Sequence, residues 1–172
     1  TFLDTLEAHH LDPATGAYFL TADDGSDLIV RPLATHDEAV PSANAVAADA
    51  LVRLAALTGD DTLRARADRV LAGVAGAAAG NVLLHAATLN AVDTRLNLAQ
   101  ILPVGARATQ FATAALAIPF PLRVVVHAAA QEPAPEGSVL AARQAAAPPE
   151  GAAFVCVGER CSLPVGDPAA LR

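Results

Sequence analysis

The chain contains no lysine, no methionine and no tryptophan, and Tyr18 is its only tyrosine. Its 11 basic residues are therefore all arginine; they face 18 acidic residues, and the formal net charge is −7. Nucleic acids require a basic surface that neutralises phosphates, and anionic membranes attract basic segments. This charge balance therefore predicts neither a nucleic acid nor a membrane as a partner.

Aromatic side chains are scarce, with one tyrosine and five phenylalanines, but hydrophobic residues make up 53 % of the 172 positions. That is enough for one domain with a core, which must be built mainly from closely packed alanine-rich helices. No apolar run reaches the length of a membrane-spanning helix, and no signal-peptide pattern opens the chain. We expect a cytoplasmic location. Gly73, Gly76 and Gly80 end an alanine-rich helix and do not form a phosphate-binding pattern, so no cofactor is predicted.

Two helices joined by a tight turn are predicted between Ser42 and Val74. Ser42–Leu57 is apolar on nearly every side, which indicates a buried helix with Ser42 as its N-cap. Gly59 is suited to end it, because glycine adopts left-handed backbone angles without strain. The next helix is apolar on one face only, at Leu63, Ala67, Val70, Leu71 and Val74. We expect an αα-hairpin with a buried inner helix and a half-exposed outer helix.

Short strands are predicted on both sides of this hairpin. Gly16–Thr21 and Leu28–Arg31 flank an Asp-Gly turn, which favours a β-hairpin at about residues 17–31. After a third helix at about 81–97, the pattern predicts two parallel strands, Leu98–Val104 and Leu122–His127, joined by a helix at about 106–117. A short helix at about 138–146 and a strand at 152–157 follow. The chain then divides into a helical portion, 1–97, and a small α/β portion, 98–172.

Several motifs occur in a characteristic order. They are Gly16-Ala17-Tyr18-Phe19, Leu28-Ile29-Val30-Arg31-Pro32, the block from Asp37 to Ala48, Leu57-Thr58-Gly59-Asp60, and a tail from Ala153 to Cys156 continued by Cys161-Ser162-Leu163-Pro164-Val165. Together they resemble the C-terminal region of the YyaL-type proteins, a family that includes the spermatogenesis-associated thioredoxin-domain proteins. The resemblance covers nearly the whole chain. Its most specific part is the combination of the Pro-Ser-x-Asn block with the Cys-x4-Cys-x2-Pro tail.

The resemblance implies an N-terminal thioredoxin-like domain followed by a toroid of six helical hairpins, similar to that of the N-acylglucosamine 2-epimerases. Residues 1–97 would form the closing portion of the toroid, and the missing hairpins and thioredoxin-like region would precede Thr1. The expected fold is thus mainly α with a small α/β appendage. Such a portion on its own would expose apolar helix surface, so we expect it to self-associate.

The loop before the first of the paired helices is the best candidate for a catalytic or binding site. His36 beside Asp37 has the residue types needed for general acid-base work, and Ser42 and Asn44 could bind a sugar-like ligand. If the resemblance holds, these side chains would face the central cleft of the toroid. Helix capping by Asp37 and Ser42, with Asn44 bound to backbone, is the competing and favoured interpretation.

Cys156 and Cys161 are a second candidate, for redox chemistry. They lack the second pair of ligands that structural zinc needs, so no metal site is predicted. Their spacing permits a disulfide between a strand and the following turn, but in a cytoplasmic protein we expect two reduced, half-buried thiols.

Two functions from different classes follow from these observations. The first is a part of a carbohydrate-active, epimerase-like protein with a thioredoxin-like domain. The alternative is a non-catalytic structural or interaction module that closes the toroid and supports a redox partner domain.

Overall fold

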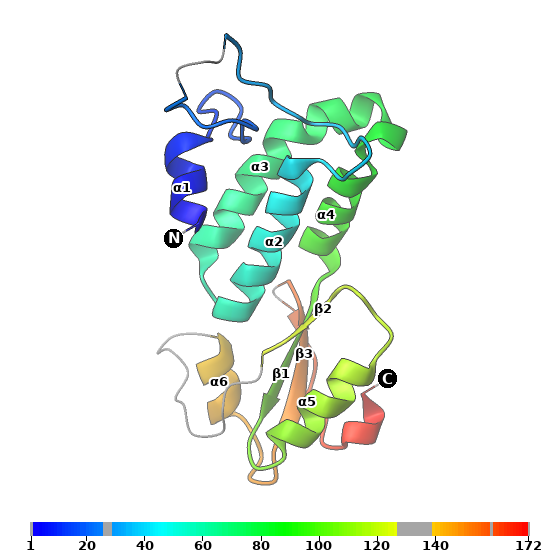
Figure 1. Ribbon diagram of the computed structural model, residues 1–172. Helices are drawn as coiled ribbons and strands as arrows, with labels where there is room; N and C mark the ends of the chain where they lie inside the picture. The colour runs from blue at the N-terminus through cyan, green and yellow to red at the C-terminus, as the bar shows by residue number, and fades with distance from the viewer. Residues whose placement is uncertain (1, 26–28, 127–138, 159, 172) are drawn as a thin grey trace. The chain divides into compact units, whose positions relative to one another are not determined.

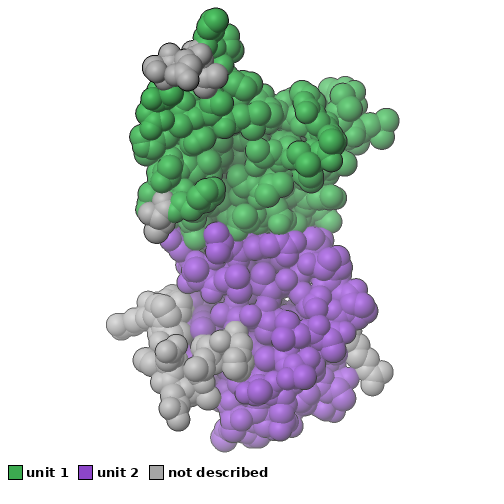
Figure 2. Space-filling model, viewed as in Figure 1, with its two compact units in different colours: residues 1–52, 61–95 green, residues 53–60, 96–172 purple. Residues whose placement is uncertain are grey.

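The computed structural model describes residues 2–25, 29–126, 139–158 and 160–171, which contain helices and a four-stranded mixed sheet (Figure 1). The expectation of a mainly α chain with a small β part is confirmed, and the six-hairpin toroid stays a prediction. The chain forms two compact units (Figure 2). Unit 1 comprises residues 1–52 and 61–95, and unit 2 comprises residues 53–60 and 96–172.

Unit 1 is helical. Its elements are α1 (Phe2–His9), most of α2 (Ala43–Thr58), α3 (Asp61–Gly80), a 3₁₀ turn (Val82–His85) and most of α4 (Ala86–Asn97). α2, α3 and α4 lie side by side (Figure 1), and their core consists of Tyr18, Ala48, Val70, Leu71 and Ala91. Gly59, between α2 and α3, has a φ of 75°, which confirms the predicted glycine turn of the helical hairpin.

α2 is buried on one side only, whereas the sequence predicted burial on most sides. Asn44, Ala48, Leu51 and Ala55 lie on the buried face. An exposed apolar face runs along the other side at intervals of three and four residues; we call it the α2 stripe, and it consists of Ala43, Val46, Ala50, Leu54 and Leu57. The prediction assumed that a helix with apolar residues on nearly every side is buried on every side. An apolar helix face can equally remain exposed.

The β-hairpin predicted at about residues 17–31 is wrong over the residues that the structure describes. Tyr18 forms an isolated antiparallel bridge with Leu11, and the Leu20 N–H donates to the Pro32 carbonyl at 3.0 Å. Side chains replace the second strand: the Arg31 guanidinium donates to the carbonyls of His9 and Thr21. Part of the predicted second strand, Leu28, lies outside the described residues.

Unit 2 contains a sheet with the strand order β2-β1-β3-β4. β1 (Ala99–Val104) pairs parallel with β2 (Arg123–Val125), and α5 (Ala108–Ala117) connects them, which confirms the predicted strand-helix-strand unit. His127, the predicted end of the second strand, lies outside the described residues. β3 (Ala152–Val157) is antiparallel to β1. The edge strand β4 (Arg160–Cys161) was not predicted, because two residues carry no periodic pattern.

A core cluster lies on each face of the sheet. One core cluster contains Ile101, Phe111, Ala115 and Ala153 and lies under α5. The other contains Leu102, Val104, Phe154 and Cys156, with Leu140 of α6 (Val139–Ala145) packed against it. Because successive β1 residues point to opposite faces, burial on both sides explains the nearly continuous apolar run of this strand. A 3₁₀ turn (Pro168–Ala170) follows β4.

No helix in the described part of the chain is both long enough and apolar enough to cross a membrane.

Gly73 and Gly76 form a matched pair for testing how α3 packs. A Cβ at Gly73 would lie 2.5 Å from the Thr15 carbonyl oxygen, whereas a Cβ at Gly76 would meet nothing within 4 Å. Alanine is usually favoured over glycine in a helix by about 0.5–1 kcal/mol. We therefore expect Gly76→Ala to raise the free energy of unfolding by about that amount. Gly73→Ala should lower it by more than about 1 kcal/mol. Urea unfolding measures both, and equal effects would contradict the packing.

Candidate functional site

Asn44 is completely buried in the first turn of α2 and is bonded to backbone on all sides. Its Oδ1 accepts the Tyr18 N–H at 2.7 Å, and its Nδ2 donates to the carbonyls of Tyr18 and Ala34 at 3.0 Å each. The amide thus bonds to both the N–H and the carbonyl of Tyr18, as the backbone of a neighbouring β-strand would do. It has the backbone-binding role that the sequence offered as one alternative, and a bound sugar would have to displace these partners.

Asp37 holds the amino ends of two helices. Its Oδ1 accepts the Ser42 N–H at 2.8 Å, just before α2, and its Oδ2 accepts the Ala87 N–H at 2.8 Å, in the first turn of α4. The bond from Ala87 and then the bond from Ser42 lower the pKa of the Asp37 carboxyl below its ordinary value. The carboxylate is therefore an anion placed where both helix termini attract negative charge.

Ser42 and His36 lie in different surroundings from each other. The Ser42 side chain is buried, and its hydroxyl donates to the Ala34 carbonyl at 3.3 Å. The His36 side chain is half exposed, and its Nε2 lies 3.5 Å from an oxygen of the exposed Glu38. Asp37 uses both oxygens on backbone donors, so His36 and Asp37 do not form the acid-base pair that a catalytic loop would need.

Cys156 and Cys161 are joined in a disulfide, so the expectation of two reduced thiols is contradicted. They are directly opposite each other in the antiparallel β3–β4 pair, with their Cα atoms 3.9 Å apart. The expectation rested on the presumed compartment, whereas strand pairing decides which sulfurs meet. Cys156 lies in the core under α6, and Cys161 is half-buried beside it.

Glu7, Tyr18 and Arg69 form a polar cluster that the sequence did not indicate. The Tyr18 hydroxyl donates to Glu7 Oε1, and Arg69 Nη2 donates to the same oxygen at 2.6 Å. Three segments far apart in the sequence supply these groups, so no local spacing could have revealed them. Arg69 Nε also approaches the Gly16 carbonyl at 3.4 Å, and the cluster fastens the 16–18 segment to α1 and α3.

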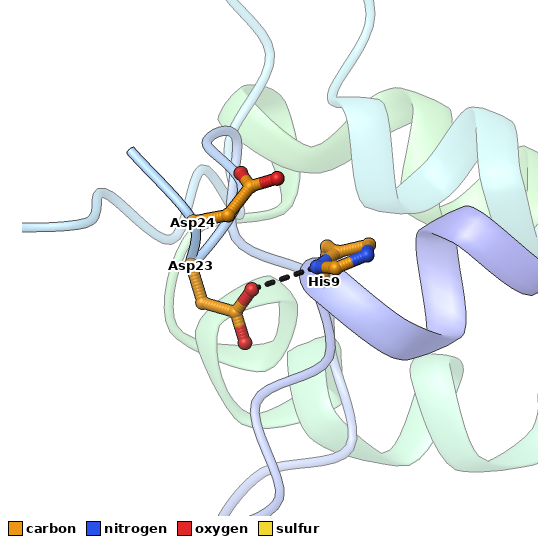
Figure 3. Close-up of side chains that lie close together, drawn as sticks. All are labelled: His9, Asp23 and Asp24. Carbon is orange, nitrogen blue, oxygen red and sulfur yellow. Dashed lines mark hydrogen bonds and ion pairs between the residues drawn. The ribbon is translucent and has the colours of Figure 1, made fainter. Parts of the chain in front are cut away.

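His9, Asp23 and Asp24 bring metal-binding atom types within 4.8 Å of one another (Figure 3). His9 Nδ1 lies 2.9 Å from Asp23 Oδ1, and this hydrogen bond raises the pKa of His9 and lowers that of Asp23. The charge of Arg31 also lowers the Asp23 pKa. A cation would have to displace the His9–Asp23 hydrogen bond and would meet the charge of Arg31. We therefore assign the cluster as a hydrogen-bonded surface pair and not as a metal centre.

The chain matches the sequence model of no protein family, and no curated protein is significantly similar to it. The resemblance to the YyaL-type proteins stays a prediction that rests on the motifs alone.

Tyr18 gives a direct test of the polar cluster, because as the only tyrosine it alone produces a phenolate absorbance. Burial, followed by the bond to Glu7, raises its pKa from 10.0 to about 12. The stabilisation linked to the neutral phenol is complete below pH 10 and is lost as the pH rises through about 12. Glu7→Gln should lower the Tyr18 pKa in an ultraviolet titration, whereas Glu38→Gln should not. An unshifted Tyr18 in the folded wild type would contradict the cluster.

Proposed function

We propose that this chain is a non-catalytic structural and interaction module that closes a helical-hairpin toroid and supports a redox partner domain. The observation that carries the proposal is the use of Asp37 and Asn44. Both Asp37 oxygens and all three recorded bonds of Asn44 go to backbone groups, and together they hold the start of α2, the start of α4 and the 18–34 segment. A catalytic loop would leave such groups open to a ligand.

The α2 stripe supports the closing role. Val46, Leu54 and Leu57 are 54 %, 36 % and 46 % exposed, although they lie on one face of a single helix with Ala43 and Ala50. In a toroid of stacked hairpins, each hairpin buries such a face against its neighbour. In the proposed toroid, α2 would become the buried inner helix once a neighbouring hairpin covers the α2 stripe. The redox partner in this proposal is the thioredoxin-like region that the motif resemblance implies.

Substitutions in the 36–44 loop separate this proposal from the carbohydrate-active alternative. Asp37→Ala should lower the free energy of unfolding by about 1 kcal/mol, because its bonds to the two helix ends are lost. Ser42→Ala should lower it by about 1 kcal/mol, because the buried bond from its hydroxyl to the Ala34 carbonyl is lost. Asn44→Ala should lower it by about 3 kcal/mol, because buried backbone groups of Tyr18 and Ala34 lose their partners. Urea unfolding measures stability, and saturation-transfer NMR with N-acyl sugars measures ligand binding.

His36→Ala is the matched control for this experiment, since its exposed side chain contacts only Glu38 among its recorded partners. We expect no change in stability and no sugar binding in any variant or in the wild type. Sugar binding by the wild type that disappears in His36→Ala would establish the carbohydrate-active alternative. Unchanged stability of Asp37→Ala would remove the structural argument.

Self-association tests the α2 stripe itself. We expect the isolated chain to form dimers or larger species, because uncovered apolar helix faces attract one another in water. Val46→Glu combined with Leu54→Glu should shift it to a monomer in light scattering. The control is Leu163→Glu, which places the same charge on a residue that is 87 % exposed and outside the stripe. A wild-type chain that stays monomeric at high concentration contradicts the prediction.

A further inference from the structure

Unit 2 contains an apolar pocket that the proposed function does not use. Its volume is about 480 Å³. That value lies inside the range of about 300–1,000 Å³ that is usual for small-molecule sites. Ile101 and Val155 of the sheet, Ile118 and Phe120 of the loop after α5, and Leu171 supply apolar walls. Arg123, the first residue of β2, is the only charged residue among the described residues that line it.

The pocket exists because α5 ends before it has covered the sheet. Ile118, the C-cap of this helix, has extended backbone angles, so the helix ends there. Leu171, which follows the 3₁₀ turn at Pro168–Ala170, packs against the same cluster. Ile118, Val155 and Leu171 pack against the core cluster under α5 but remain partly exposed. A hollow with apolar walls is left between the helix end and the C-terminal turn.

The charge of Arg123 is held in place without being neutralised by a carboxylate. Its guanidinium donates to the carbonyls of Phe120 and Leu116, and the second of these bonds is 2.6 Å long. Both acceptors are neutral peptide oxygens. One of them belongs to the last turn of α5, where the helix dipole also stabilises a positive charge. Within the described ranges the structure records no ion pair for Arg123, and its Nε is buried without an acceptor. The remaining Nη hydrogens are free to meet an anion.

We propose that this pocket binds a small aliphatic monocarboxylate. The hydrocarbon tail would lie against Ile101, Val155 and Leu171, and the carboxylate would meet the Arg123 guanidinium, which is suited to planar anions. A cationic ligand would be repelled. A neutral hydrocarbon would cover the guanidinium with apolar atoms and leave its charge unmatched. A polyphosphate would find one positive group and otherwise apolar walls. The apolar walls with one arginine therefore select a single negative charge on an apolar body.

The test compares three ligands with eight-carbon alkyl chains, and it uses the 172-residue protein. Octanoate, 1-octanol and octylammonium are titrated while amide shifts in β1 and β3 are followed by NMR. We expect saturable octanoate binding at least about tenfold tighter than octanol binding, which corresponds to about 1.4 kcal/mol, and no saturable binding of octylammonium. Raising the salt concentration should weaken the binding of octanoate more than the binding of octanol. These comparisons need no variant, so they do not depend on whether a substitution changes folding.

Arg123→Gln should reduce octanoate binding to the level of octanol and leave octanol nearly unchanged. Arg107→Gln is the matched control, because Arg107 also donates to two backbone carbonyls, those of Glu150 and Gly166, but does not line the pocket. It should leave both ligands unaffected.

Three results would overturn the proposal: no saturable octanoate binding at millimolar concentration, equal binding of octanoate and octanol, or the same loss in Arg107→Gln as in Arg123→Gln. If a short peptide ending in leucine bound more tightly than octanoate, the ligand would be a peptide C-terminus, and the proposal of a small aliphatic monocarboxylate would be wrong. None of these results bears on the stability effects in the 36–44 loop.

Discussion

The side-chain amide of Asn44 is the interaction on which the arrangement of unit 1 depends. It takes the N–H and the carbonyl of Tyr18, and these groups lie 26 residues away in the sequence. A buried peptide group without partners costs about 1–3 kcal/mol, so an irregular segment can lie inside a helical unit only if something replaces the missing strand. Asn44 does this from a rigid helix. Asp37 adds a second fixed point, and the segment between Tyr18 and α2 is therefore held at both ends.

Helices and buried strands could be predicted because their signals are local. The one-faced pattern of α3, the turn at Gly59 and the apolar runs of β1 and β3 depend on neighbours a few residues away. The 17–31 segment has an equally good local pattern for a hairpin, yet the backbone of Tyr18 pairs with Leu11 and with the Asn44 side chain. Whether this segment pairs with a second strand or with a distant side chain depends on tertiary contacts, which a local sequence pattern does not contain.

In the candidate site, too, some residues could be recognised from the sequence and others could not. Asp37, Ser42 and Asn44 were singled out because carboxylate, hydroxyl and amide groups at the start of a helix have either capping or ligand-binding uses. Sequence alone left these uses open, since the same atoms accept a backbone N–H or a ligand hydroxyl. Arg123 carried no signal at all. Its importance comes from an uncovered part of the sheet and from the end of α5, and both are consequences of tertiary packing.

The Cys156–Cys161 bond has a consequence for the denatured chain. It spans only five positions, so it closes a very small loop. The chain-entropy account assigns such a loop about 2 kcal/mol, less than a bond between distant segments would give. The bond therefore adds modestly to global stability, but it keeps β3 and β4 adjacent even when the rest of the sheet has come apart. An oxidised chain that unfolds retains this one closed turn, with the register of its shortest strand already set.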